Sequence, residues 1–185
     1  MCAARTARSA GSARPPGLRA RPVRAPLVRR TGPPYCPVVL DDTDTALVRL
    51  LSTDGRTSLT DLARSTGLSV SAVHQRVRRL EARGVLLGYA ARVDPTAAGL
   101  PLTAFVSITP TDPAAIDDAP DRLRHLAAVE ACHSVAGEES YILKVRVASP
   151  GALEALLAEI RAGAAVSTRT TVVLSTPWEG RPPAL

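Results

Sequence analysis

The segment from Leu59 to Leu80 constrains the fold more than any other part of this 185-residue chain. Apolar residues recur at helical spacing in each half of the segment, and these two stripes are Leu59, Leu62 and Ala63, then Val73, Val77 and Leu80. Gly67 stands between the stripes, where a left-handed backbone allows a tight turn. Ser69 is the expected N-cap of the second helix, because its hydroxyl can accept a free first-turn amide. The pattern predicts a helix-turn-helix.

The outer face of the second helix is predicted to be polar and basic. The side chains outside its apolar stripe can all donate hydrogen bonds, and with the cap they are Ser69, Ser71, His74, Gln75, Arg76, Arg78 and Arg79. A helix fits the major groove, where Arg pairs with guanine and Gln with adenine, while hydroxyls and further arginines hold phosphates. The alternative is a solvated basic face on a helical hairpin. The spacing of Ala63, Gly67 and Val73 favours a DNA-binding unit instead.

Charge is distributed unevenly along the chain, whose net charge is +6. Residues 1–37 carry +8, residues 40–92 carry +2 and residues 93–185 carry −4. The acidic C-terminal half is therefore not expected to contact nucleic acid over a broad surface. The first of these segments holds seven of the sixteen prolines and is predicted to be a disordered tail. Alternatively, the true translation start lies near residues 38–40 and this segment is absent from the native protein. As a targeting sequence it lacks the apolar core of a secretory signal.

Several other classes of protein are excluded by what the sequence lacks. The cysteines, Cys2, Cys36 and Cys132, form no CxxC pair, and Cys132 and His133 would point to opposite faces of a strand. We expect a reduced, cytoplasmic protein without a metal. No apolar run approaches the roughly 20 residues that cross a bilayer. Ser140 lacks the G-x-S-x-G context of a nucleophile and no phosphate loop is present, so we expect neither an enzyme nor a cofactor.

The rest of the chain reads as a first helix over 40–53, an extended segment over 85–93, and a second domain beyond Pro101. In that domain strand-like and helical patterns alternate as βαββαβ, over 102–108, 113–127, 129–137, 141–148, 150–162 and 166–176. Two βαβ halves predict an antiparallel four-stranded sheet with both helices on one face, the ferredoxin-like arrangement. The other face has no cover. Some strands are expected to carry apolar side chains on both faces, and these strands contain Phe105, Ile142, Val145 and Val173. Burial of that face predicts a dimer.

This order of elements resembles the feast/famine regulators of the leucine-responsive regulatory protein and AsnC (Lrp/AsnC) family, over Leu40 to about Trp178. The motifs are LDDTD, DGRTSLTDLARSTGLS, VHQRVRRLEARGVLLGY and GEESYILKV. The resemblance implies a transcription factor that is dimeric through its sheet, often octameric, and responsive to an amino acid bound between subunits. The expected fold is α+β, and its parts are a tail (1–37), a winged-helix-like helix-turn-helix domain (38–88), a linker strand (89–100), a ferredoxin-like effector-binding and oligomerisation domain (101–178) and a second tail (179–185).

The resemblance also implies where the effector binds. The residues that match the family's glycine-acid turn beside the effector pocket are Gly137, Glu138, Glu139, Ser140 and Tyr141. Backbone amides of such a turn could hold a carboxylate, and Glu138 is the residue expected to hold the ammonium group. Many relatives have a second acid where this chain has Ser140. Thr168 and Thr170 match positions near the same pocket. The alternative is an ordinary hairpin turn.

Two other functions stay open. One is an architectural DNA-binding protein without an effector, and the other is an amino-acid-binding regulatory subunit of a metabolic enzyme.

Overall fold

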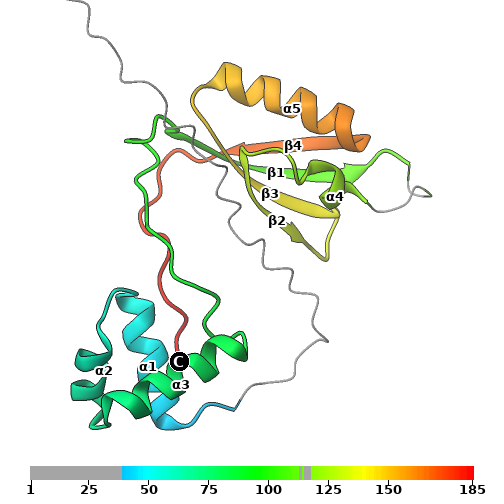
Figure 1. Ribbon diagram of the computed structural model, residues 1–185. Coiled ribbons are helices and arrows are strands. Elements are labelled where there is room, and N and C mark those ends of the chain that lie inside the picture. Colours follow the sequence, from blue (N-terminus) through cyan, green and yellow to red (C-terminus); the bar gives the residue numbers. More distant parts are fainter. Residues whose placement is uncertain (1–38, 113, 115–117) are drawn as a thin grey trace, which may run out of the picture. The chain divides into compact units, whose positions relative to one another are not determined.

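The computed structural model describes residues 39–112, 114 and 118–185, so the basic tail and its predicted disorder lie outside the described residues. The elements follow one another along the chain as α1 (Asp42–Thr53), α2 (Leu59–Thr66), α3 (Val70–Ala82), β1 (Leu102–Pro110), α4 (Ala119–Leu123), β2 (Val129–Ser134), β3 (Tyr141–Val147), α5 (Pro150–Ala164) and β4 (Val166–Val172) (Figure 1). In the described part of the chain, no helix is long and apolar enough to cross a membrane.

Each helix of the N-terminal domain begins at a capping side chain. The Asp41 carboxylate accepts the amide of Asp44 and so starts α1. Ser58 caps α2 and Ser69 caps α3 in the same way, and α2 ends at Gly67, whose φ is +71°. The predicted cap and turn glycine are therefore confirmed, and the first predicted helix is α1, which begins two residues later than expected.

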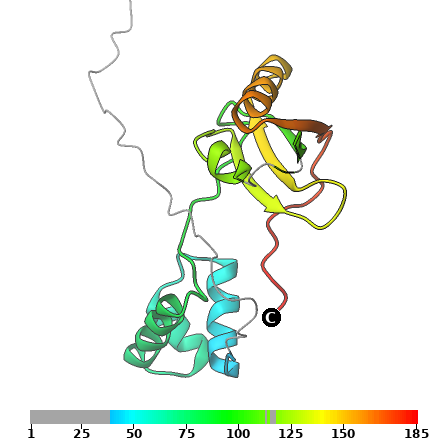
Figure 2. The same cartoon turned by 90° about the vertical axis from the view of Figure 1, so that its right-hand side faces the viewer.

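The three helices pack into one bundle around a small apolar core (Figure 2). Its buried aliphatic residues are Leu47, Val48, Leu51, Leu62, Ala63, Val73, Val77 and Leu80. The stripes predicted for α2 and α3 contribute to this core, with Leu59 only partly buried. Asp44 of α1 is buried with them, at 2% exposure. A buried carboxylate is unusual, because burying a charge is costly unless the charge is paired, and Asp44 is paired with Arg76 and Arg79.

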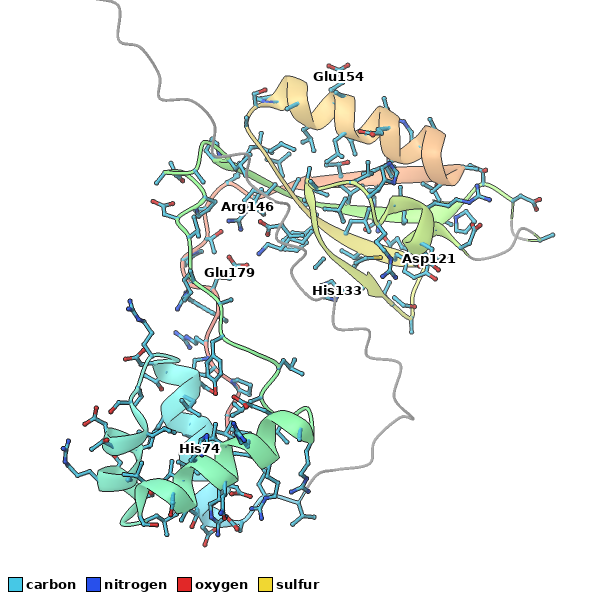
Figure 3. The ribbon with its side chains drawn as sticks, viewed as in Figure 1. His74, Asp121, His133, Arg146, Glu154 and Glu179 are labelled. Atoms are coloured by element: carbon cyan, nitrogen blue, oxygen red, sulfur yellow. The ribbon has the colours of Figure 1, made fainter. Side chains whose placement is uncertain are left out.

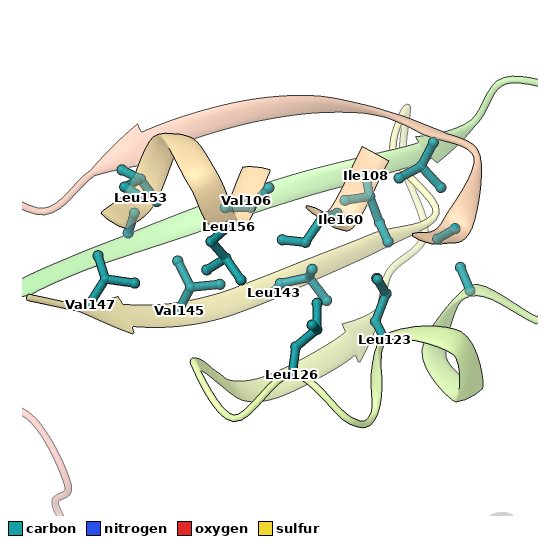
Figure 4. Close-up of a cluster of buried hydrophobic side chains, with 14 residues drawn as sticks. Val106, Ile108, Leu123, Leu126, Leu143, Val145, Val147, Leu153, Leu156 and Ile160 are labelled. Atoms are coloured by element: carbon teal, nitrogen blue, oxygen red, sulfur yellow. The ribbon is translucent and has the colours of Figure 1, made fainter. Parts of the chain in front are cut away.

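The C-terminal domain is a four-stranded antiparallel sheet in the order β2-β3-β1-β4. Both α4 and α5 pack on one face of it, as the ferredoxin-like arrangement requires (Figure 4). The core between the layers is apolar and comprises Ala104, Val106, Ile108, Ala119, Leu123, Leu126, Leu143, Val145, Val147, Leu153, Leu156, Ile160, Ala164 and Val166. The helix predicted over 150–162 is confirmed by α5.

The helix predicted over 113–127 extends too far at its C-terminal end, and residues 113 and 115–117 lie outside the described residues. Only Ala119–Leu123 form α4, with a proline in the first turn. After Arg124 the chain turns, since the amide of Leu126 donates to the carbonyl of Leu123 and that of Val129 donates to Leu126. These turns place the Leu126 side chain in the core and lead directly into β2. The apolar spacing therefore predicted correctly that Leu123 and Leu126 are buried, but the turns that connect α4 to β2 end the helix early.

The predicted linker strand over 89–100 is not formed. The described residues between α3 and β1 belong to no strand, and a turn closes at Leu100, whose amide donates to the carbonyl of Pro95. A strand requires a neighbour to complete its hydrogen bonds, and no described segment supplies one here. Leu87, Tyr89 and Val93 are consequently exposed.

The uncovered face of the sheet is more polar than expected. Phe105, at 41% exposure, and Ile142 do lie on it, but Val145 is fully buried on the helix-covered face. The positions adjoining Val145 in β3 are Lys144 and Arg146, which point to the open face because side chains alternate along a strand. Val173 follows the end of β4.

Candidate DNA-binding surface and effector site

A row of exposed donors runs along the outer side of α3. Ser71, His74, Gln75 and Arg78 are all exposed, and His74 is labelled on this helix in Figure 3. They lie opposite Val73, Val77 and Leu80 because an α-helix turns by about 100° per residue. The N-cap Ser69 is exposed at the start of the row. This arrangement can present hydroxyl, imidazole, amide and guanidinium groups to one ligand surface.

Two further arginines of α3 are committed to other partners. Arg76 Nη1 donates to Asp41 Oδ2 at 2.6 Å and to Asp44 Oδ1 at 2.7 Å. Arg79 Nη2 donates to Asp44 Oδ2 at 2.8 Å. The hydrogen bond from Arg76, together with that from the backbone amide of Asp44, holds the pKa of Asp41 below its ordinary value. Arg76 and Arg79 were predicted as DNA contacts, but in this structure they join α3 to α1.

Pairing reduces the basic charge that the helical domain presents. Arg64 pairs with Asp61 at 2.7 Å. Arg78 and Arg83 make no ion pair within the described residues, which leaves Arg78 as the cation in the middle of the outer row. After the end of α3 the Tyr89 hydroxyl donates to Glu81 at 3.1 Å, and partial desolvation of the hydroxyl, followed by this hydrogen bond, raises the pKa of Tyr89.

In the C-terminal domain, some of the predicted effector residues surround one shallow cavity of about 290 Å³. Its walls are Ser107, Thr109, Glu138, Glu139, Ser167, Thr168 and Arg169. Arg169 of β4 forms an ion pair with Glu139, whose side chain is 18% exposed. The cavity therefore offers acids and a cation side by side, which are the groups that a zwitterion needs.

Other predicted effector residues lie elsewhere. Tyr141 packs against the apolar core, and Thr170 pairs with Val106, which places its side chain on the helix-covered side. Gly137 and Ser140 do not line the cavity. The backbone of Ser140 is used twice, since its amide donates to Ile108 and its carbonyl accepts from Val135. Thr168 lines the cavity, while its hydroxyl accepts a hydrogen bond from Arg161 at 3.1 Å.

Arg169 was not among the effector-binding residues predicted from the sequence. It alternates with Thr168 and Thr170 along β4, so period-2 alternation alone indicates that one face holds the threonines and the other holds Arg169. What the alternation does not reveal is which face meets the glycine-acid turn. The pairing of Arg169 with Ser107 across β1 decides that question.

A second cluster of charges lies on the open sheet face. Arg146 contacts Glu130 at 3.1 Å and Glu179 at 3.8 Å, and Lys144 pairs with the same two acids. Figure 3 shows Arg146 and Glu179. The hydrogen bond from Lys144 is the main reason that the pKa of Glu179 lies below its usual value. Sequence reasoning did not single out this cluster.

No metal-binding group emerges from the described residues, which contain no set of three or more His, Cys, Asp or Glu side chains that could hold an ion. Cys132 pairs with Leu143 and His133 with Ile142. These two positions face opposite sides of the sheet.

Both domains match domains of known proteins. Residues 40–81 match the AsnC-type helix-turn-helix domain, and residues 103–183 match the Lrp/AsnC ligand binding domain. The chain is 60% identical over 142 residues to the HTH-type transcriptional regulator LrpA of Mycobacterium tuberculosis, covering 77% of this chain and 95% of that protein. It is 35% identical over 139 residues to the leucine-responsive regulatory protein of Escherichia coli K12, covering 73% and 85%.

Solved structures agree with this relationship. A feast or famine regulatory protein from M. tuberculosis complexed with L-methionine superposes with a TM-score of 0.77 at 59% identity, over 78% of this chain and 99% of that one. The structure of LrpC from B. subtilis superposes with a TM-score of 0.69 at 30% identity, over 75% and 97%. With both domains matched in the same order along the sequence, the chain belongs to the Lrp/AsnC family of helix-turn-helix transcriptional regulators.

Proposed function

We propose that this transcriptional regulator reads duplex DNA with the outer row of α3 and that an amino acid bound in its C-terminal domain modulates it. The observation that carries the DNA part is the row of exposed donors on a helix whose opposite side is packed in a helix-turn-helix core. Gln75 and Arg78 have the functional groups that read adenine and guanine edges, with His74 beside them. Ser69 and Ser71, at the N-terminus of α3, suit phosphate contacts, because first-turn amides and hydroxyls bind anions.

The effector part is supported by the shallow cavity beside the glycine-acid turn. A free amino acid carries an ammonium and a carboxylate group. Glu138 and Glu139 offer acceptors for the ammonium, and Arg169 offers a cation for the carboxylate. A relative from M. tuberculosis was solved with L-methionine, so this ligand class is chemically reasonable for the pocket. Of the predicted set we propose Glu138 as the ammonium ligand, with Glu139 and Thr168 beside it in the cavity, and we propose no other cofactor.

We also propose that the protein is a homodimer that assembles further. The open sheet face carries Phe105, which is 41% exposed, and Ile142. Covering such groups with a second copy removes apolar surface from water. An effector that fits one assembly better than another would shift the equilibrium between them by its difference in affinity. A DNA partner of this kind implies a cytoplasmic location.

Footprinting the full chain on its own upstream DNA, with and without each of the twenty amino acids, tests this function. We expect protection of a discrete site, weakening steeply with added salt because phosphate contacts release counterions. We expect at least one amino acid to change the pattern. A mobility shift that stays absent even at low ionic strength would exclude DNA binding. If DNA binds but calorimetry with all twenty amino acids is silent, the architectural alternative is correct.

Replacing Glu138 by alanine tests the ammonium contact. We expect Glu138→Ala to bind operator DNA as tightly as wild type, since the residue is far in sequence from α3, and to lose the response to the amino acid identified above. The matched control is Glu154→Ala, which removes the same charge from the exposed side of α5 (Figure 3). An unchanged response in the Glu138 variant would remove this residue from the site.

A further inference from the structure

Asp44 is the one charged residue that the described part of the chain buries, and both of its carboxylate oxygens hold arginines of α3. Oδ1 accepts from Arg76 at 2.7 Å and Oδ2 accepts from Arg79 at 2.8 Å. Asp41, one helical turn earlier, accepts from Arg76 as well, at 2.6 Å. We call Asp41, Asp44, Arg76 and Arg79 the acidic clamp. The acid and the arginine of each hydrogen bond are 32 to 35 residues apart in sequence, so the clamp joins α1 directly to the helix that carries the outer row.

The clamp occupies a different side of α3 from the outer row. Taking about 100° per residue, Ser71, His74, Gln75 and Arg78 centre opposite the apolar stripe, whereas Arg76 and Arg79 lie between that row and the stripe. Arg76 and Arg79 are one turn apart, so two tethers on successive turns oppose rotation of α3 about its own axis. Apolar packing alone is less directional, because aliphatic contacts depend mainly on buried area.

Burial of Asp44 makes the clamp costly to open. Its side chain is only 3% exposed, and a buried carboxylate that loses its partners is left uncompensated in a medium of low polarity. If Arg76 and Arg79 both moved to DNA phosphates, Asp44 would be left buried without a partner, so the two arginines cannot leave together without that penalty. Lysine or arginine side chains that are free at a protein–DNA interface have no such restraint and bind phosphates of any sequence.

We propose that Asp44 is a positioning and specificity-determining residue: it withholds Arg76 and Arg79 from the phosphate backbone and holds α3 in the rotation at which its outer row meets base edges. This inference rests on the proposed DNA binding by α3. Arg76 and Arg79, which were predicted to contact DNA, thereby take an orienting role. Asp44 contributes to sequence discrimination although it lies on α1 and not in the outer row.

The test is Asp44→Asn in the full chain, which keeps the shape of the side chain and removes its charge. Binding to the operator and to a random duplex of equal length is measured over a series of salt concentrations. We expect affinity for random DNA to rise and its salt dependence to steepen, by about 0.9 in log–log slope for each arginine released to a phosphate. Operator affinity should fall, so that the ratio of specific to random binding drops by about tenfold or more.

The matched control is Asp61→Asn, which removes one negative charge from the same domain but leaves the clamp intact, because Asp61 is exposed and pairs with Arg64. It measures the general electrostatic effect of one lost acid. If Asp44→Asn changes the melting temperature but not the ratio of specific to random binding beyond this control, the residue is only structural and the inference is wrong.

A second variant keeps the test decisive if Asp44→Asn does not fold. Arg79→Gln leaves Asp44 paired with Arg76. An orienting role for Arg79 predicts a lower ratio of specific to random binding with an unchanged salt slope on random DNA. A direct phosphate contact would instead weaken both duplexes equally and reduce the slope by about one, which would overturn the inference. Wild-type protein that binds no DNA at all would contradict the proposed function itself.

Discussion

The helical domain and the sheet domain hold themselves together in different ways. The helical domain encloses a carboxylate beside its aliphatic core and uses it to bind two arginines. The sheet domain encloses only apolar side chains among its described residues, and its ion pairs lie outside that core, on the open face around Arg146 and Glu130 and along α4. A buried ion pair adds little net stability, yet removing one partner is costly because the other charge is left buried and unpaired, whereas apolar burial adds stability with little direction. The buried charge lies in the domain that contains α3.

The largest effect should come from the core of the sheet domain. Leu143 is fully buried between β3 and the covering helices, so Leu143→Ala should lower the free energy of unfolding by about 2–5 kcal/mol. Ile142→Ala, its neighbour on the open face, should cost much less as long as the chain is monomeric. Denaturant unfolding of the full chain, followed at dilutions that separate subunits, measures both. Equal losses would contradict the contrast between the two faces.

The next effect concerns the outer row of the helical domain. Arg78 has no ion pair among the described residues and can reach a ligand without breaking one. We expect Arg78→Ala to weaken operator binding by about 1–3 kcal/mol if the residue reads a base. Arg83→Ala, which removes another exposed arginine after α3, is the control. Titration against operator and random duplexes distinguishes the roles, since an equal loss on both would make Arg78 a phosphate contact.

The smallest effects come from two glycines that should respond with opposite sign. Gly67 has a φ of +71° between α2 and α3, so Gly67→Ala should destabilise the helical domain by about 1–2 kcal/mol although nothing lies within 4 Å of the added methyl group. Gly163 lies within α5, where Gly163→Ala should stabilise the sheet domain by about 0.5–1 kcal/mol. Thermal unfolding of both variants checks the signs. Stabilisation by Gly67→Ala would mean that the turn does not need its left-handed backbone.

Much of the fold could be predicted because it depends on local patterns. The stripes of α2 and α3, the cap at Ser69 and the glycine at Gly67 are read within a few residues, and so is the alternation of the strands. The errors arose where local pattern meets distant structure. Residues 85–93 have strand-like alternation but pair with no strand among the described residues, and the helix expected over 113–127 ends early because Leu126 is needed in the core.

In the candidate sites, too, features that depend on local pattern were predicted and features that depend on distant contacts were not. Sequence reasoning found the exposed donors of α3 and the glycine-acid turn, since composition and motif mark both. It did not distinguish Arg76 and Arg79 from Arg78, because their acidic partners on α1 are more than thirty residues away. It also did not find Arg169, which reaches the cavity only through the pairing of β4 with β1.

The sequence by itself determined which segments become helices and strands, where the helix-turn-helix lies and to which family the chain belongs, because hydrophobic period, capping residues and motif order are written in neighbouring positions. The tertiary structure alone decided which arginines are available for a ligand and which are bound internally. An arginine has the same charge in either case, and only the burial of Asp44 beside two of them makes those two costly to release.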